Sequence, residues 1–463
     1  MLPRPLRAIW GNLSKEEIKK FGILAGIFFL IIGVYSMLKS IKDPIFDLHV
    51  GYSLQPWAKG ASIFFIALSV LFYSKLVDLF KKNVVFYLMC GIYGVLMIVL
   101  SYFLANPHLA TLSPDSFIYS IPGIGYLINQ IPGSFLGWTT YLFVESFGSI
   151  LPALFWAFVA STTTVSSARR GYAMIVTCTQ VGNILGPSAV FKFRGQLGLP
   201  IFFAISGLLI LVIALLVKWY VIAVPQEQAE EPISNGKKGG TGFFEGLRLL
   251  LTRPYLLGIF VVATFYEFIG TILDFQMGML ASAIYPSKLD GGAAFAWFKS
   301  IQNMSIGWIS LAFAIFGTSF FMRVFGLRFC LVAFPATIGL TVLTIFASYY
   351  CGLSQLYLLW IFLASLVLIK AINYALNNPT KEVLYIPTSK DVKFKAKGWI
   401  DAFGARLLKG LSVPVSISLS DSLPVLLSVG TVMSLGFVGV WIVVAFSVSG
   451  AFDILQRDNK IVE

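Results

Sequence analysis

Long apolar runs recur along this chain, and short polar connections separate them. A helix needs about 20 apolar residues to cross a bilayer. Runs of about this length lie near 21–41, 60–79, 84–104, 135–160, 172–191, 200–222, 255–281, 296–320, 328–349, 355–376, 400–420 and 424–449. The pattern predicts an all-α polytopic membrane protein with about 12 transmembrane helices.

Basic residues in the connections predict the orientation of these helices. Lys and Arg cluster at residues 4–20, 75–82, 169–170, 237–253, 323–328, 381–397 and 457–460. The alternate connections are poor in cations, and the long one near 105–134 has none. Because cytoplasmic connections carry the excess of Lys and Arg, both termini are expected to be cytoplasmic.

A charged, glycine-rich stretch at 223–253 divides the chain near its middle. It predicts an N-terminal six-helix half at 1–222, a cytoplasmic linker, and a C-terminal six-helix half at 254–463. Two six-helix halves joined in this way are the layout of major-facilitator transporters, whose substrates bind between the halves near midplane. The predicted fold is therefore major-facilitator-like.

Composition agrees with a membrane protein and excludes several other classes. Hydrophobic residues form 57% of the chain and charged residues only 12%. The net charge of +13 lies mostly in the connections, so it predicts topology and no nucleic-acid partner. The four cysteines lie in or at the ends of apolar runs, and no CxxC pair occurs. We therefore expect no disulfide framework, metal or other cofactor.

Catalytic signatures are also missing from the sequence. It contains no GxxxxGK[ST] phosphate loop, so we expect no ATP hydrolysis. The two histidines, His49 and His108, lie in polar connections far apart. These features predict a transporter and not an enzyme.

Charged residues inside the first-half spans are the first candidates for function. A charge at the centre of a span costs about 2.5–3.5 kcal/mol, so each one is a functional hypothesis. Lys42, next to Asp43, ends the first span, and Glu145 lies well inside the fourth. Lys42 is either an interface anchor or a residue that captures an anion. Glu145 is either a structural partner of a buried cation or a functional residue, which is a gating or coupling acid or a site residue that pairs with a cation when substrate leaves.

The second half offers two cations on one helix face. Arg406 and Lys409 are three residues apart in the eleventh span. Such a pair suits a polyphosphate, because Arg binds oxygens in a bidentate manner and Lys supplies a compact charge. The alternative is an interhelical salt bridge, for instance with Asp401.

Two acids share a face of the seventh span. Glu267 and Asp274 are seven residues apart, so they lie one above the other. They either hold a proton between them or neutralise cations such as Lys370, in the tenth span, or Lys409.

Four uncharged polar residues lie in the spans nearby. They are Gln180, Asn183, Gln302 and Asn303. Their side chains either hydrogen-bond a base or sugar or join helices to one another.

Four sequence motifs resemble those of one known family. The longest runs from Tyr374 to Lys409 and contains TKE, YIP, KFKAK and ID before the Arg and Lys. The others are YSMLKSIKDP at 35–44, VESFGS at 144–149 and ARRGYA at 168–173. Together they resemble the non-mitochondrial ATP/ADP translocases of plastids and energy-parasitic bacteria, in the same order along the whole chain.

The resemblance implies which residues bind the substrate. The family's functional charges correspond to Lys42, Glu145 and Lys409, and its acid in the seventh helix corresponds to Asp274, where Glu is usual. Gln180 aligns with a position that is often Asn. After Asp274 this chain reads DFQMG, which lacks the family's Trp and Lys. Glu267 stands where the family usually has a small residue.

These observations predict a nucleotide transporter that works by alternating access, most simply by ATP/ADP exchange. The alternative within this class is nucleotide or NAD import coupled to protons, with Glu267 as the proton carrier. An alternative from another class is a proton-coupled transporter of small organic anions. The resemblance further implies a bacterial inner membrane, and we expect a monomer.

Overall fold

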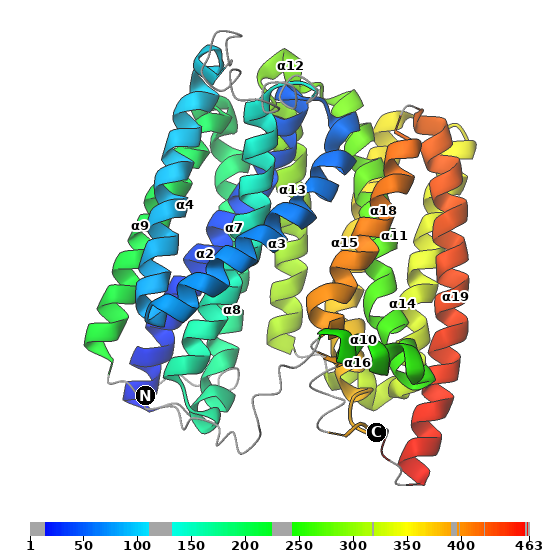
Figure 1. The fold of residues 1–463 in the computed structure, drawn as a ribbon. Helices are drawn as coiled ribbons and strands as arrows, with labels where there is room; N and C mark the ends of the chain where they lie inside the picture. The colour runs from blue at the N-terminus through cyan, green and yellow to red at the C-terminus, as the bar shows by residue number, and fades with distance from the viewer. Residues whose placement is uncertain are drawn as a thin grey trace. The chain divides into compact units, whose positions relative to one another are not determined.

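The computed structural model of the protein is built almost entirely of helices (Figure 1). It describes residues 14–110, 132–224, 243–316, 319–389, 396–397, 399–420, 422–458 and 461. Most of the predicted linker at 223–253 lies outside this part of the chain, as does most of the basic run at 390–397. Contacts divide the chain into two compact units, which are described separately below.

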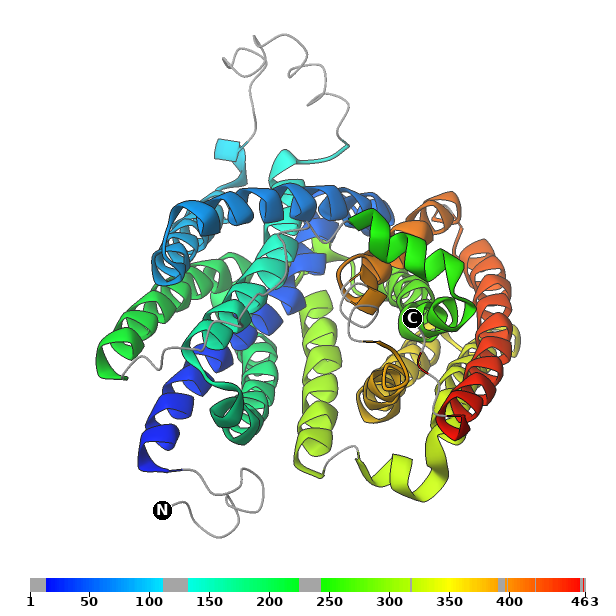
Figure 2. The ribbon, with the colours of Figure 1, turned by 60° about the horizontal axis from the view of Figure 1, so that its bottom comes forward.

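The first unit comprises Met1–Ile233 together with Tyr285–Ile315. Its main helices are α2 (Lys15–His49), α3 (Gln55–Leu79), α4 (Lys82–Ala105), α7 (Phe135–Thr162), α8 (Val165–Leu197), α9 (Leu199–Ala223), α12 (Ser287–Asp290) and α13 (Ala293–Phe316). The short 3-10 helices Tyr52–Leu54 and Pro107–Ala110 follow α2 and α4. Figures 1 and 2 show α2 passing beside α7 and α8, against which it packs.

The second unit comprises Ser234–Ile284 and Phe316–Glu463. Its helices are α10 (Phe243–Thr252), α11 (Pro254–Ile284), α14 (Ser319–Tyr350), α15 (Gln355–Ile372), α16 (Asn378–Val383), α18 (Ala405–Ser418) and α19 (Leu423–Arg457). Two π-helical turns interrupt this unit, at Asn373–Asn377 before α16 and at Ile400–Gly404 before α18. Such turns are rare and occur frequently at functional sites.

One segment groups differently from the predicted halves. Residues 285–315, which carry α13, follow the predicted boundary in sequence but belong to the first compact unit. Gly307 of α13 explains part of this grouping, because a Cβ there would lie 2.9 Å from the Ile184 side chain and 3.2 Å from the Asn183 carbonyl oxygen of α8. The division into two six-helix halves stays a prediction.

Ten helices of the described residues are long and apolar enough to cross a membrane. The two other predicted spans, at 296–320 and 400–420, are helical as well. The first contains α13, whose hydropathy is lowered by Lys299, Gln302 and Asn303. The second contains α18, which has only 14 residues. The two segments that deviate most from a simple apolar span both carry charged residues of interest.

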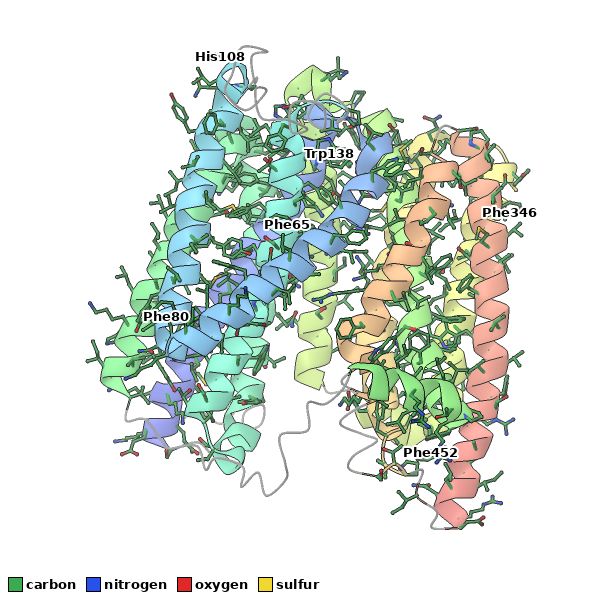
Figure 3. All side chains as sticks on the ribbon, viewed as in Figure 1. Phe65, Phe80, His108, Trp138, Phe346 and Phe452 are labelled. Atoms are coloured by element: carbon green, nitrogen blue, oxygen red, sulfur yellow. The ribbon has the colours of Figure 1, made fainter. Side chains whose placement is uncertain are left out.

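Exposed side chains of both units suit a lipid environment. Figure 3 shows side chains projecting outward along the helices, and many of the exposed ones are large and apolar. Phe64 of α3 is 79% exposed, Ile222 of α9 74% and Val432 of α19 67%. Apolar surface of this kind on several helices is stable when lipid covers it.

Small residues bring α2 and α8 into backbone contact. A Cβ on Gly186 would lie 2.1 Å from the Gly33 carbonyl oxygen, and one on Gly182 would lie 2.4 Å from the Phe29 carbonyl oxygen. Spacing of small residues four apart is a common device for close packing of membrane helices. This contact fixes α2, which carries the charged residues at 42–43, against α8.

Candidate substrate site

Lys42 and Glu145, which lie in the first and fourth predicted spans, form an ion pair in the first unit. Lys42 of α2 donates from Nζ to Glu145 Oε1 of α7. The Lys42 side chain is 8% exposed and that of Glu145 25%. Tyr141 lies one turn before Glu145, and Lys42 Nζ is 4.2 Å from the centroid of its ring. The structure thus gives Glu145 the buried cationic partner that was one of its two sequence interpretations.

Asp43 extends this pair into a network of four charges. Its carboxylate lies 3.7 Å from Lys42 Nζ and 2.9 Å from the Nζ of Lys299 on α13. The side chains of Asp43 and Lys299 are 9% and 3% exposed. We call Lys42, Asp43, Glu145 and Lys299 the first charge cluster. With two lysines and two carboxylates it is electrically balanced.

Sequence reasoning missed Lys299. It is the one charged residue in the predicted span at 296–320, which was the signal that could have found it. Its partner could not be deduced, since Asp43 and Lys299 are far apart in sequence. The grouping of α13 with the first unit brings them together.

Hydrogen bonds between polar side chains brace the same helices. Ser36 of α2 donates to Asn183 Oδ1 of α8, and Asn303 of α13 donates to Ser40 Oγ of α2 over 3.0 Å. Asn183 and Asn303 therefore join helices, which is one of the two roles expected for them. Gln180, one turn before Asn183 on α8, is half-buried.

The second unit holds a more exposed pair. Lys409 Nζ of α18 lies 3.1 Å from Glu267 Oε2 of α11, with side chains 41% and 27% exposed. Gly404 permits this approach, since a Cβ there would lie 3.0 Å from the Thr264 side chain of α11. Neutralisation of Lys409 by Glu267 is therefore what the structure shows, as one of the sequence alternatives expected.

Arg406 adds a further cation beside this pair. It is half-buried on α18, one turn before Lys409. Among residues whose side chains the structure describes, Arg406 has no ion-pair partner. The side chain of Asp401, its predicted alternative partner, lies outside the described set. Glu267, Lys409 and Arg406 form the second charge cluster, which carries one more positive than negative charge.

Two further predicted residues lie apart from this pair. Asp274 is half-buried on α11, two turns beyond Glu267, and Lys370 is half-buried near the end of α15. Both have interaction partners, so neither is an isolated charge. Their roles in binding or coupling stay predictions.

The two clusters differ in what they can do chemically. An anion that approaches the second cluster meets a surplus cation and a lysine whose partner is partly exposed. Arg and Lys together bind phosphate oxygens through charge-assisted hydrogen bonds. Among the described residues, no group of three or more His, Cys, Asp or Glu side chains could hold a metal ion.

Comparison with solved structures identifies the fold. The chain matches the POT family transporter PepTSo with a TM-score of 0.60 and 12% identity, over 96% of this chain and 99% of that one. It matches the nucleoside transporter NupG with a TM-score of 0.57 and 12% identity, over 94% and 99%. At these identities the matches establish the fold, which is that of a major-facilitator-type transporter, as predicted.

Sequence comparison identifies the family to which the chain belongs. The family model described as TLC ATP/ADP transporter matches residues 4–452, and the chain belongs to this family. It is 25% identical over 441 residues to ADP,ATP carrier protein 1 of Rickettsia prowazekii, covering 87% of this chain and 86% of that protein. It is also 25% identical over 508 residues to the chloroplastic ADP,ATP carrier protein 2 of Arabidopsis thaliana, covering 97% and 77%. The resemblance found in the sequence motifs is confirmed.

Proposed function

We propose that this protein exchanges nucleotides of the ATP/ADP type across a membrane by alternating access. Family membership supports the substrate class. The observation that carries the proposal is the second charge cluster, in which Lys409 is held by Glu267 beside Arg406. A carboxylate that pairs with a cation in the absence of substrate is a group that phosphate oxygens can replace.

Binding in the second cluster follows from charge and geometry. Phosphates compete with Glu267 for Lys409, while Arg406 takes a second phosphate through its planar guanidinium. The surplus positive charge makes the exchange of partners favourable for a polyanion. Asp274, two turns from Glu267 on the same helix and outside this cluster, is proposed to offset the surplus charge from a distance when the site is empty.

The first cluster supplies the other proposed contacts. Lys42 is the proposed phosphate ligand of the first unit, and Glu145 is the group that holds it when substrate is absent. Gln180 is proposed to hydrogen-bond the base or sugar. Breaking these ion pairs would leave charges unpaired inside a membrane protein, which is costly, so the empty carrier is expected to reorient slowly. Slow return of the empty carrier couples export of one nucleotide to import of another.

The exposure of Glu267 favours a second candidate. A carboxylate that phosphate releases from its lysine partner is a candidate group for carrying a proton. Glu267 would then carry a proton together with the nucleotide. In the empty state, Lys370 or Lys409 would be its counter-charge. Proton-coupled import of a nucleotide or NAD would follow.

Uptake into proteoliposomes distinguishes these candidates. Purified protein is reconstituted with and without internal ATP, and uptake of labelled ATP, ADP, GTP, UTP and NAD is measured. Exchange predicts uptake only into loaded vesicles, whereas proton coupling predicts uptake into empty vesicles under an imposed pH gradient. If no nucleotide is taken up under either condition, the substrate assignment is wrong, and small organic anions are tested next.

The membrane setting is part of the proposal. The ten candidate spans support a multi-pass membrane protein, and bacterial relatives in Rickettsia and in Chlamydia muridarum support a bacterial inner membrane. We propose cytoplasmic termini, from the distribution of basic residues, and a monomer. Accessibility of terminal tags in intact cells tests the orientation.

A further inference from the structure

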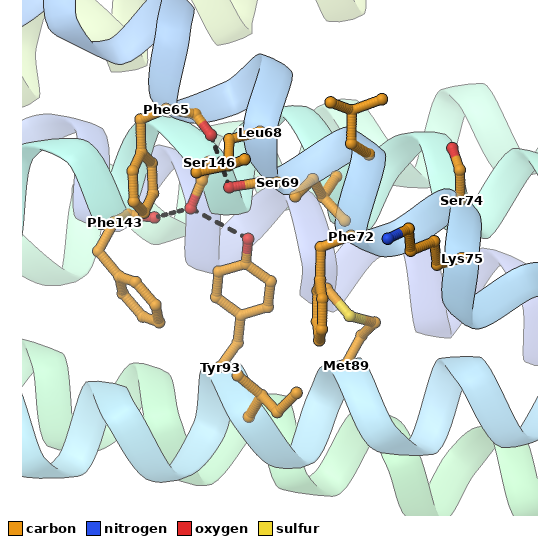
Figure 4. A pocket seen from close by; sticks show the side chains of 13 residues that line it. Phe65, Leu68, Ser69, Phe72, Ser74, Lys75, Met89, Tyr93, Phe143 and Ser146 are labelled. Atoms are coloured by element: carbon orange, nitrogen blue, oxygen red, sulfur yellow. Dashed lines mark hydrogen bonds between the residues drawn. The ribbon is translucent and has the colours of Figure 1, made fainter.

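A cavity of about 740 Å³ lies within the first unit, between α3, α4 and α7 (Figure 4). Its floor is formed by buried side chains of α4 and α7, including Met89, Tyr93 and Ser146. Its rim is formed by α3, where Leu68 is 66% and Phe72 53% exposed. The cavity therefore opens onto the surface of the unit, and we call it the α3 cleft.

The depth of the α3 cleft indicates what surrounds it. Its α3 residues, 65–75, lie in the C-terminal half of the candidate span Tyr52–Val77, and its α4 residues, 89–93, lie in the candidate span Asn83–Ala105. At this depth the surrounding medium is hydrocarbon. A cleft with largely apolar walls is a poor site for water, and it suits the apolar chains of lipid.

The polar atoms of the floor already have partners. Tyr93 donates its hydroxyl hydrogen to Ser146 Oγ over 3.0 Å, and Ser146 donates to the Phe143 carbonyl oxygen over 2.9 Å (Figure 4). Ser69 of the rim likewise donates to the Phe65 carbonyl oxygen. A polar ligand would find these groups occupied, whereas an acyl chain needs none of them.

Positive charge at one end of the cleft favours a lipid with an acidic headgroup. Lys75, a lining residue, is exposed one turn before the end of α3, and Lys81 is exposed just beyond that end. Within residues 70–85 the sequence has three lysines and the single acid Asp78. This end belongs to a predicted cytoplasmic connection, where acidic headgroups attract basic residues.

We propose that the α3 cleft binds a phospholipid with an acidic headgroup. One acyl chain lies over Met89 and Tyr93, and the headgroup phosphate lies against Lys75. The Lys75 side chain is long and flexible enough to place its amine at the level of a headgroup phosphate, which suits this role. The proposal rests on the cavity, its depth and its charge, and it is independent of the transported substrate.

The position of the cleft connects the lipid to the candidate substrate site. Ser146, in the floor, is adjacent in sequence to Glu145, whose carboxylate pairs with Lys42. The bound chain therefore packs against the helix that presents Glu145. Occupancy of the cleft supports that helix from the membrane side, and transport is expected to be faster in vesicles that contain acidic phospholipid.

Photo-crosslinking tests the binding directly. Full-length protein is reconstituted in phosphatidylcholine vesicles with a trace of phosphatidylglycerol that carries a diazirine on one acyl chain. After illumination, labelled peptides are mapped by mass spectrometry. We expect labelling of the cleft residues of α4 and α7 that excess phosphatidylglycerol suppresses severalfold and excess phosphatidylcholine does not. Labelling no stronger than that of the exposed face of α9, around Leu208, overturns the proposal.

Matched variants separate the two parts of the ligand. Ile92→Trp or Ser69→Trp fills the cleft and abolishes its labelling, whereas Leu208→Trp on α9 leaves it unchanged. Lys75→Gln removes the preference for phosphatidylglycerol over phosphatidylcholine, whereas Lys218→Gln, an exposed lysine of α9, retains it. Correct folding of each variant is checked by gel filtration. If Lys75→Gln keeps the full preference, the headgroup assignment is wrong.

Discussion

The two charge clusters of this transporter are built from the same residue types in different surroundings. In the first cluster, Lys42, Asp43, Glu145 and Lys299 neutralise one another, and the two lysines are almost fully buried. In the second, Glu267 holds a half-exposed Lys409 while Arg406 adds a surplus positive charge. A buried cluster with equal numbers of positive and negative charges stabilises the packing of its helices. An exposed cluster with a surplus positive charge favours the binding of an anion. From this comparison we propose that the second cluster makes the first contact with phosphate.

The largest expected effect is that of Lys42→Gln. It removes the lysine that pairs with Glu145 and one of the two lysines near Asp43, in a largely buried cluster. Removing one member of a buried ion pair costs about 3–5 kcal/mol, so the detergent-purified variant should unfold at a clearly lower temperature than the wild type. Transport should be lost as well. The double variant Lys42→Gln/Glu145→Gln should regain much of the stability without regaining transport, and unchanged stability of Lys42→Gln would contradict the role given to the first cluster.

Lys409→Gln should act on binding more than on stability. It removes one charge-assisted contact with phosphate, which corresponds to about 1.5–3 kcal/mol, or roughly a tenfold to hundredfold weaker affinity for ADP. Adenosine affinity should stay unchanged, because it has no phosphate. Thermal unfolding should change little, since the Lys409–Glu267 pair is partly exposed. Equal loss of ADP and adenosine binding would point to a folding defect instead.

Gly186→Ala tests the frame that holds the first cluster. The new methyl group would collide with the Gly33 carbonyl oxygen and push α2 from α8, at a cost of about 1–3 kcal/mol. Gly195→Ala on the same helix is the matched control, because nothing lies within 4 Å of its Cβ position. Gly186→Ala should therefore unfold at a lower temperature than Gly195→Ala. Equal unfolding temperatures would contradict the importance of the backbone contact between α2 and α8.

Glu267→Gln should have a smaller effect of opposite sign on affinity. It releases Lys409 from competition, so ADP should bind a fewfold more tightly, in line with about 0.2–1 kcal/mol for a solvent-exposed pair. Turnover should fall, since the empty carrier loses a counter-charge. Weaker ADP binding in this variant would show that Glu267 contacts the substrate and does not compete with it.

The smallest effect is expected at an ion pair outside both clusters. The Nζ atom of Lys397 lies 2.5 Å from Oε2 of Glu382, and the two side chains are 28% and 50% exposed, respectively. Exposed pairs contribute about 0–1 kcal/mol, so Lys397→Gln should leave stability and ADP affinity near wild type. A loss as large as that of Lys409→Gln would mean that any change in charge disturbs this protein.

The sequence predicted the architecture and much of the second cluster. Hydropathy located every described helix that is long and apolar enough to span a membrane. The positions of Glu267 and Lys409 in their spans led to the expectation that one could neutralise the other. Lys299 escaped prediction because its importance depends on where α13 packs, which no local pattern encodes. The predicted span at 400–420 is helical, but hydropathy did not indicate its division into a π-helical turn, which lies against α11, and the short α18.

Phosphate capture by the second cluster is tested most directly by ADP and adenosine binding to the double variant Arg406→Gln/Lys409→Gln, measured by calorimetry against the wild type. We expect ADP binding to be lost while the protein stays folded, as monitored by gel filtration and thermal unfolding. Undiminished ADP affinity in a folded double variant would contradict phosphate capture by the second cluster.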